Sequence, residues 1–329
     1  MALASASALV GRPRRAPGAV AGFRRDGADE MTAATLRLAP RLVEACARTE
    51  EGRAWLARLP SEIDASLASW RLHIEPGDWG AGASCSFIAF VRRADGSPAV
   101  LKLGLPHMEA EHELEGLRFW AGDGAINVLE ADAVSGAMLL ERCEPGVPLS
   151  LRPEPEQDSV VTGLLARLWR PPPAAHPFRP LAEMARYWAD VQLARRGEWP
   201  DAGLVQAGID LFLALAAPGP DDVLLATDLH AGNVLSARRA PWLAIDPKPF
   251  VGDRAYDVTQ HLLNCIPRLS RDPRGTITRV AELAGLDAGR VARWMFGRLA
   301  ISACSSASIY GMSGAEATEL ARRCTRNGN

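Results

Sequence analysis

The chain has 329 residues, 48% of them hydrophobic, which is enough for two lobes that each bury a core. Its 37 basic and 39 acidic residues leave a formal charge of -2, so the overall charge gives no attraction to nucleic acid or to an anionic membrane. The sequence has no apolar run of the ~20 residues that cross a bilayer, and its six cysteines form neither a C-x-x-C pair nor a metal-ligand spacing. We therefore expect a cytoplasmic protein with free thiols, partnered by neither nucleic acid nor membrane.

Residues 1–30 are rich in Ala, Gly and Arg, have no acidic residue before Asp26 and show little apolar periodicity. Their Arg pairs resemble a twin-arginine signal and their composition resembles a transit peptide. Neither Arg pair, however, precedes an apolar segment of the required ~7–15 residues. We expect a disordered extension, with Met31 as an alternative start.

The next part of the chain is expected to combine helices with strands. Apolar residues recur at helical intervals over 36–59. Two runs rich in Val, Ile, Leu and Phe, 86–93 and 97–104, meet at the turn sequence Ala-Asp-Gly-Ser and predict two strands joined by a hairpin. A helical period returns over 109–122, and further strands are expected at 126–132 and 137–142.

After the proline-rich stretch 143–156 the pattern becomes mainly helical. The predicted helices are 181–196, 203–216, 255–266 and 289–303. The segment 233–246 breaks this pattern and predicts a β-hairpin set among helices.

Folding this hairpin about residues 239 and 240 brings candidate ligands together. Antiparallel pairing would then set Asn233 opposite Asp246, and Asp228 would approach the same end from the preceding loop. Two carboxylates and an amide oxygen are hard ligands that suit Mg²⁺ carrying substrate phosphates, and one carboxylate can act as a base. Zinc would instead call for His or Cys ligands.

The segment ATDLHAGN at 226–233, followed by Ile-Asp at 245–246, resembles the catalytic segment of the aminoglycoside phosphotransferases of the protein-kinase-like superfamily. In that family it reads H-G-D-x-H-x-x-N, then a hairpin and I-D. The resemblance extends over most of residues 70–265. It implies an α+β, two-lobed protein-kinase-like fold. The N-lobe, 31–141, would be small, β-rich and nucleotide-binding with one key helix; the C-lobe, 142–329, would be mainly helical and hold the catalytic loop and the substrate.

The resemblance also implies roles for single residues. Asp228 corresponds to the catalytic base, and Asn233 and Asp246 to the ligands of magnesium ions on the ATP phosphates. His230 lies where protein kinases often carry a Lys beside the γ-phosphate, which implies a polarising or charge-neutralising role. Ala-Thr at 226–227 replaces the usual His-Gly, which puts the bracing of the loop in question and not its metal ligation. Asp257 is expected to brace the backbone of this loop, in preference to a contact with substrate.

A kinase also needs a lysine on a strand and an acid on the following helix. Lys102 in the predicted strand would position the α- and β-phosphates, and Glu113 would be its ion-pair partner. We choose Glu113 over Glu115 because Glu113 shares a helical face with Leu117.

Two further segments complete the expected nucleotide site. Gly80 and Gly82 precede a strand and would let backbone N–H groups approach the phosphates of ATP. By family analogy, the backbone from Glu141 to Cys143 would hydrogen bond to adenine between the lobes.

The segment IDPKPFVGDRAYD at 245–257 is similar to the streptomycin 6-phosphotransferase branch. We therefore expect an ATP-dependent O-phosphotransferase that acts on a small, hydroxylated and cationic molecule, with an aminoglycoside such as streptomycin as the leading acceptor and antibiotic resistance as the associated role. One alternative is a kinase of another small alcohol metabolite. Another is a catalytically inactive nucleotide-binding pseudokinase, which the replaced residues 226–227 would explain.

Overall fold

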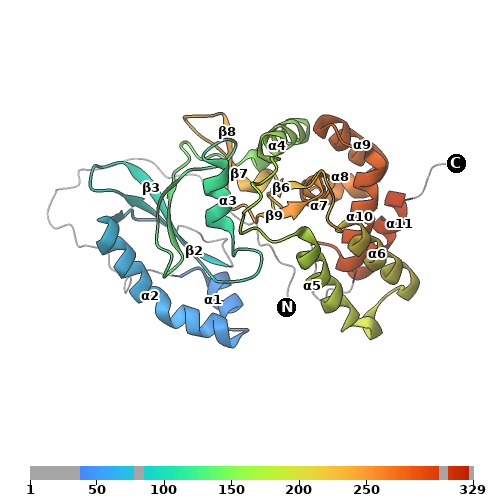
Figure 1. Cartoon of the computed structure of the whole chain (residues 1–329), viewed down its shortest axis with the longest axis horizontal. Helices are drawn as coiled ribbons and strands as arrows, with labels where there is room; N and C mark the ends of the chain where they lie inside the picture. Colours follow the sequence, from blue (N-terminus) through green and yellow to red (C-terminus); the bar gives the residue numbers. More distant parts are fainter. Residues whose placement is uncertain (1–37, 78–84, 304–309, 326–329) are drawn as a thin grey trace, which may run out of the picture. The chain divides into compact units, whose positions relative to one another are not determined.

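The computed structural model describes residues 38–77, 85–303 and 310–325, which form two compact units (Figure 1). The smaller unit contains the described residues up to Pro106 together with Val128–Arg142. The larger unit contains His107–Asn127 and the described residues from Cys143 onwards. The lobes proposed from the sequence, 31–141 and 142–329, stay a prediction. The helix predicted at 109–122 belongs to the larger unit.

The smaller unit is built on an antiparallel five-stranded sheet of order β1-β2-β3-β5-β4. Its strands are β1 (His73–Ile74), β2 (Ser86–Arg92), β3 (Pro98–Gly104), β4 (Val128–Ala131) and β5 (Ala137–Glu141). The hairpin predicted at 86–104 is confirmed: β2 and β3 pair over their whole length, and Gly96 adopts φ 81° in the turn. A positive φ is readily adopted by glycine, which has no Cβ.

Helices α1 (Pro40–Cys46) and α2 (Glu50–Trp70) pack on this unit, where one helical segment was predicted (Figure 1). The break between them is set by Thr49, whose hydroxyl accepts a hydrogen bond from the N–H of Gly52 at 3.0 Å and caps α2. Trp55, Leu59 and Ile63 then recur every four residues on one buried face of α2. This face joins apolar side chains of β2, β3 and β5 in one core.

The larger unit is mainly helical. Its helices are α3 (Glu113–Trp120), α4 (Glu154–Leu168), α5 (Leu181–Leu193), α6 (Ala202–Leu215), α7 (Arg254–Leu263), α8 (Ile266–Arg271), α9 (Pro273–Ala284), α10 (Ala288–Ser302) and α11 (Gly314–Thr325). The predictions for α3, α5, α6, α7 and α10 are confirmed, whereas α4, α8, α9 and α11 were not predicted.

Helix α10 packs against α6, α7, α9 and α11 and forms the centre of this unit (Figure 1). Its Trp294 is fully buried and meets Phe212 of α6 and Tyr256 of α7 edge to face, with ring centroids 5.5 and 5.1 Å apart. The backbones of α6 and α10 approach so closely at Gly208 that a Cβ there would lie 2.1 Å from the Cβ of Ala300. The helix that carries the active-site residues described below, α7, is therefore held against a rigid core.

Two short strand pairs interrupt the helices. Strand β6 (Val223–Leu225) pairs with β9 (Phe250–Gly252), and β7 (Val234–Ser236) pairs with β8 (Trp242–Ala244). The β7–β8 hairpin was predicted and is confirmed. The β6–β9 pair was not predicted, although it brings the two ends of segment 226–249 together.

The predicted register of the β7–β8 hairpin is wrong by one residue. Val234 pairs with Ala244, and the N–H of Ile245 donates to the carbonyl of Asn233 at 2.9 Å, so Asn233 faces Ile245 and not Asp246. The reason lies in the turn, which the pairs of β7 and β8 centre on Arg239, whereas the prediction centred it between residues 239 and 240. Asp246, with φ 53°, lies beyond the ladder.

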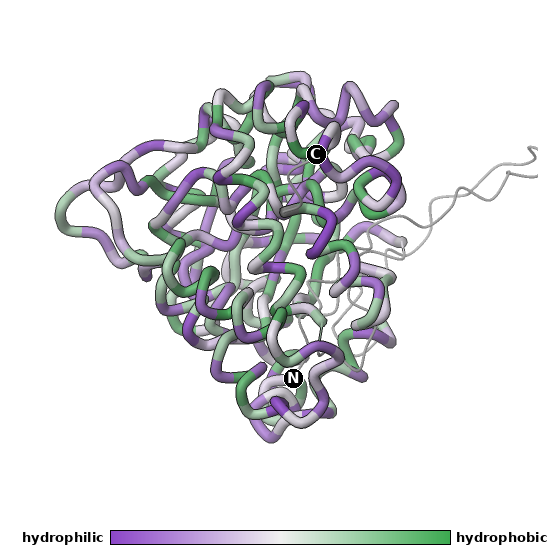
Figure 2. The backbone as a smooth tube through the Cα atoms, turned by 90° about the vertical axis from the view of Figure 1, so that its right-hand side faces the viewer, coloured by the Kyte–Doolittle hydropathy of each residue, from purple (hydrophilic) through white to green (hydrophobic). Residues whose placement is uncertain are grey.

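Along the part of the chain that is coloured in Figure 2, hydrophobic and hydrophilic residues alternate without gathering into one long apolar segment. Accordingly, among residues 38–77, 85–303 and 310–325 we find no helix with the length and hydropathy needed to cross a membrane. The cysteines in these ranges are free thiols, as predicted.

Candidate active site

The loop that follows β6 is braced from α7 by Asp257. This fully buried carboxylate accepts hydrogen bonds from the N–H groups of Ala226 and Thr227, at 3.0 and 2.7 Å, and from the indole of Trp169 at 2.9 Å. Burial raises the pKa of Asp257 to about 6, and the three hydrogen bonds oppose that rise. The expectation that Asp257 braces the loop is confirmed, and it shows how the loop is held without the usual His-Gly.

Thr227 adds a second brace. Its hydroxyl donates to the carbonyl of Lys248 at 2.5 Å, and the N–H of Lys248 donates to the carbonyl of Ala226 at 2.8 Å. Thr227 itself has φ 45°, an unusual value for a β-branched residue, which these contacts maintain. The loop and the segment after β8 are thereby joined as one rigid piece.

Asp228 stands on this piece, 4% exposed, with a donor on each of its carboxylate oxygens. The amide of Gln260 on α7 donates to Oδ1 at 2.6 Å, and the ammonium of Lys248 lies 2.8 Å from Oδ2. A carboxylate oxygen has two lone pairs, so each oxygen retains one for an acceptor hydroxyl. Asp228 is thus oriented on both sides and can still accept a hydrogen bond.

The orientation of Gln260 is in turn fixed by Arg298 of α10. Arg298 donates to Oε1 of Gln260 at 2.5 Å and to the hydroxyl of Thr259 at 2.8 Å, and its guanidinium lies 4.6 Å from the ring centroid of Tyr256. Because a guanidinium can only donate, the amide oxygen of Gln260 must face it and the amide nitrogen must face Asp228. Tyr310 also donates to the same oxygen, at 3.3 Å.

His230 is 3% exposed, and its Nδ1 accepts a hydrogen bond from the N–H of Gly232 at 3.0 Å. An accepting Nδ1 carries no proton, so the imidazole is neutral and its proton is on Nε2. Burial lowers the pKa of His230 to about 4, which agrees with a neutral ring. The charge-neutralising role expected for His230 is therefore unsupported, whereas Nε2–H, which has no partner among the described residues, can act as a polarising donor.

Asn233 and Asp246 lie beside this centre. The amide nitrogen of Asn233 donates to the backbone carbonyl of Asp228 at 3.0 Å, which makes the amide oxygen the atom that can meet a cation. The carboxylate of Asp246 lies near both Lys248 and His230. It adds to the rise that Asp228 causes in the pKa of Lys248, and it partly offsets the fall that burial causes in the pKa of His230. These residues thus converge even though the predicted hairpin register is wrong.

An amide oxygen and a carboxylate oxygen fit a hard divalent ion that takes its other ligands from phosphates and water. In the part of the chain that the structure describes, no three His, Cys, Asp or Glu side chains are grouped to hold a metal ion.

The residues predicted to bind the nucleotide fall in different parts of the chain. Lys102 is buried on β3, where it pairs with Ile88 of β2 and Met138 of β5, and Glu113 is the buried first residue of α3. These two residues belong to different units, so their ion pair stays a prediction.

The remaining nucleotide residues also stay predictions. Glu141 ends β5, and Cys143 is the buried residue that opens the second part of the larger unit. Gly80 and Gly82 lie outside the described residues.

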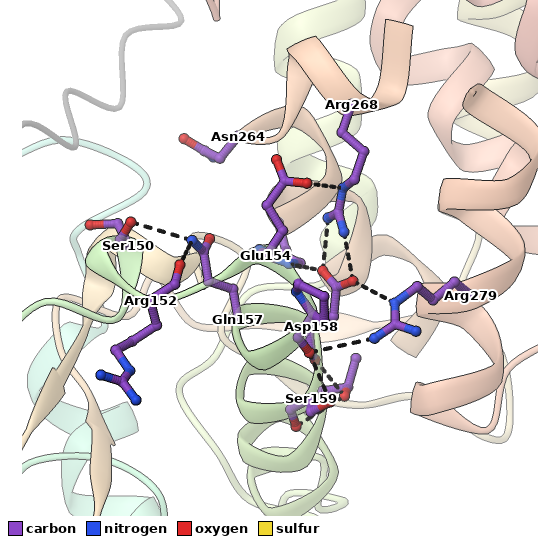
Figure 3. A network of polar contacts seen from close by, with 12 residues as sticks. Ser150, Arg152, Glu154, Gln157, Asp158, Ser159, Asn264, Arg268 and Arg279 are labelled. Atoms are coloured by element: carbon purple, nitrogen blue, oxygen red, sulfur yellow. Dashed lines mark hydrogen bonds and ion pairs between the residues drawn. The ribbon is translucent and has the colours of Figure 1, made fainter. Parts of the chain in front are cut away.

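A second buried cluster lies around Asp158 and also holds α7, through His261 (Figure 3). Asp158 of α4, fully buried, accepts two hydrogen bonds from Arg268 at 2.7 and 2.8 Å and one each from Arg279, at 3.0 Å, and His261, at 2.9 Å. Burial alone would raise the pKa of Asp158, but these donors hold it well below its usual range. Because His261 follows Gln260 directly, the cluster fixes the helix that positions Asp228.

Sequence reasoning missed Lys248, Gln260 and Arg298. For Lys248 a signal was present: Lys102 and Lys248 are the only lysines among 37 basic residues. In a chain that otherwise uses arginine, a retained lysine marks a position where a compact ammonium matters. Gln260 and Arg298 had no comparable signal, since their roles depend on the packing of α7 against α10.

Comparison with known proteins gives a consistent result. The family model described as aminoglycoside/hydroxyurea antibiotic resistance kinase matches residues 71–309. Streptomycin 6-kinase of Streptomyces glaucescens is 37% identical over 262 residues, 76% of this chain and 83% of that protein. Hydroxyurea phosphotransferase of Kitasatospora aureofaciens is also 37% identical, over 254 residues that cover 75% of this chain and 73% of that protein.

Among solved structures, choline kinase LicA of Streptococcus pneumoniae is similar with a TM-score of 0.55 at 14% identity, over 82% of this chain and 99% of that one. At this level of identity the similarity concerns the fold alone, and it agrees with the predicted protein-kinase-like fold.

Proposed function

This chain belongs to the family of aminoglycoside/hydroxyurea antibiotic resistance kinases, and we propose that it transfers the γ-phosphoryl group of ATP to a hydroxyl of streptomycin or a closely related aminoglycoside. The observation that carries the proposal is the arrangement around Asp228, a buried carboxylate held by Gln260 and Lys248 beside Asn233 and Asp246. This arrangement favours an active kinase over a nucleotide-binding pseudokinase.

In the proposed reaction Asp228 orients the acceptor hydroxyl and takes its proton as the new bond forms. The loose transition state of phosphoryl transfer depends mainly on alignment, which the donors on both oxygens of Asp228 provide. His230 would donate from Nε2 to an oxygen of the phosphoryl group or of the acceptor. Lys102 would position the α- and β-phosphates.

Asn233 and Asp246 would hold magnesium through their side-chain oxygens. When bound, the metal would offset negative charge on the phosphates and keep them in register with the acceptor. Neither residue takes part in proton transfer in this proposal.

A second acceptor has specific support. The hydroxyurea phosphotransferase of Kitasatospora aureofaciens is as similar to this chain as the Streptomyces glaucescens streptomycin kinase, at 37% identity each. Hydroxyurea is small and uncharged, whereas streptomycin is large and cationic. The two acceptors therefore make opposite demands on the acceptor site, and one assay can separate them.

The test is incubation of the purified protein with Mg-ATP and, separately, streptomycin, hydroxyurea and choline, followed by mass spectrometry of each acceptor. We expect streptomycin to gain one phosphoryl group, and Asp228→Asn to reduce this transfer by at least 10²-fold. Asp221→Asn is the matched control, because Asp221 is exposed in the loop before β6. If the wild-type protein did not modify streptomycin but did modify hydroxyurea, the second acceptor would replace the first.

A further inference from the structure

Lys248 is anchored to the same rigid piece of chain as the proposed base. Its backbone is bonded to Ala226 and Thr227, its side chain is 13% exposed, and its Nζ lies 2.8 Å from Oδ2 of Asp228. A second carboxylate, that of Glu109, lies 3.8 Å away. The ammonium is thus held in place from two sides and remains partly accessible.

An ammonium group has three N–H donors, and Lys248 uses one of them on Asp228. The distance to Glu109 is too long for a hydrogen bond. Within the described ranges no other acceptor lies within hydrogen-bond distance of Nζ. Two donors are therefore available to a bound molecule, in a largely buried position where a fixed charge acts strongly.

The position of Asp228 places these donors near the reacting atoms. A base must lie within about 3 Å of the hydroxyl that it deprotonates, and the attacking oxygen must lie within about 3.5 Å of phosphorus. An ammonium in contact with that base is consequently within reach of the oxygens of the transferred group. The neutral ring of His230, whose Nδ1 accepts from Gly232, provides no positive charge there.

We propose that Lys248 is a catalytic residue that donates hydrogen bonds to the transferred phosphoryl group and offsets its charge, the role that a lysine near the position of His230 would otherwise fill. This inference rests on the proposed phosphotransfer. In the step, the acceptor oxygen forms a bond to the γ-phosphorus and the bond from phosphorus to the bridging oxygen breaks. The electron pair of that bond leaves with ADP, the acceptor proton passes to Asp228, and Lys248 keeps its protons.

The competing explanation is that Lys248 serves only as a counter-ion that positions Asp228. Lys248→Met removes the charge at similar length, and we expect it to lower kcat about 10²- to 10³-fold with little change in either KM. Lys248→Arg should recover at least a tenth of the wild-type kcat. Arg238→Met is the control, because it removes a cation whose side chain is 82% exposed and pairs with Glu144.

A double variant separates the two explanations. If Lys248 contacts the phosphoryl group, Lys248→Met in an Asp228→Asn background should lower the residual transfer at least tenfold further. If Lys248 only positions Asp228, its removal has no further effect once Asp228 is replaced, and the double variant should transfer phosphate at the same rate as Asp228→Asn. Equality of these two rates would overturn the proposal.

Binding of ADP with Mg²⁺ and fluoroaluminate, which imitates the transferred group, gives a readout independent of turnover. Lys248→Met should weaken this complex at least tenfold and leave ADP affinity within twofold. Isotope labelling of lysine yields two side-chain signals, and the one lost in Lys248→Met should shift when the complex forms. A wild-type protein that modifies no acceptor would refute the proposed function. The fluoroaluminate measurement would still decide the role of Lys248, because an unchanged affinity of Lys248→Met for the ADP–fluoroaluminate complex would reject that role.

Discussion

Replacing Gln260 by glutamate should convert the orienting contact of Asp228 into a repulsive one. The new carboxylate would lie where the amide nitrogen now donates to Oδ1 at 2.6 Å. At that distance two negative charges repel by about 6 kcal/mol for an effective dielectric constant of ~20. Relaxation that doubles the separation would leave about 3 kcal/mol, equivalent to about 2 pH units.

The new carboxyl and Asp228 would share one proton and titrate as a pair. Each has a cationic partner, because Arg298 already contacts Oε1 of Gln260 and Lys248 lies 2.8 Å from Oδ2 of Asp228. A protonated Asp228 cannot accept the acceptor proton. The acid limb of the kcat/KM profile of Gln260→Glu should therefore move up by about 2 pH units, with activity recovering at alkaline pH.

The assay is ADP release with streptomycin as acceptor across the neutral and alkaline range. Asn264→Asp is the matched control, because Asn264 is exposed at the end of the same helix and contacts only the backbone of Gln260. Its profile should stay within a few tenths of a pH unit of the wild-type profile. An unmoved acid limb in folded, ATP-binding Gln260→Glu would show that Gln260 does not act on Asp228 in the working enzyme.

Three other predictions concern stability and are measured by denaturant unfolding. Because the pKa of Asp257 is raised to about 6 in the folded protein, its contribution to the free energy of unfolding is full below pH ~4 and is lost as the pH rises through 6, by about 3 kcal/mol. Asp257→Asn should remove this pH dependence of stability, and an unchanged dependence would contradict the prediction. Asp158→Asn should lower the free energy of unfolding by about 3 to 5 kcal/mol, because it leaves buried cations unpaired. The control Glu154→Gln, at a side chain that is 52% exposed, should lower it by less than about 0.5 kcal/mol. Gly208→Ala should destabilise by about 1 to 3 kcal/mol because its Cβ would overlap α10, while Gly163→Ala, with open space around it, should not destabilise; equal effects would argue against this packing.

The sequence predicts the elements whose periodicity is local. The β2–β3 hairpin and helices α5, α6, α7 and α10 were predicted because apolar spacing alone defines them. Helix α4 was missed because prolines at 153 and 155 were interpreted as breakers of the pattern. They occupy the N-cap and first turn of the helix, where no backbone donor is lost.

The proposed site divides in a similar way. The proximity of Asp228, Asn233 and Asp246 could be predicted because their spacing is fixed by one loop and one hairpin, whereas their roles stay proposals. The register error at Asp246 came from the centre of the turn, which lies on Arg239 and not between residues 239 and 240. Gln260 could not be predicted, because its contact with Asp228 depends on α7 packing under the loop.

One side of α7 carries Asp257 and, three and four residues after it, Gln260 and His261. That side holds the loop backbone, the base and the Asp158 cluster at once. A small rotation of this one helix would break all three attachments together. Arg268 of α8 and Arg279 of α9 belong to the Asp158 cluster. Substitutions in α8 or α9 can therefore change the rate of phosphoryl transfer from a distance, because a rotation of α7 moves the carboxylate of Asp228.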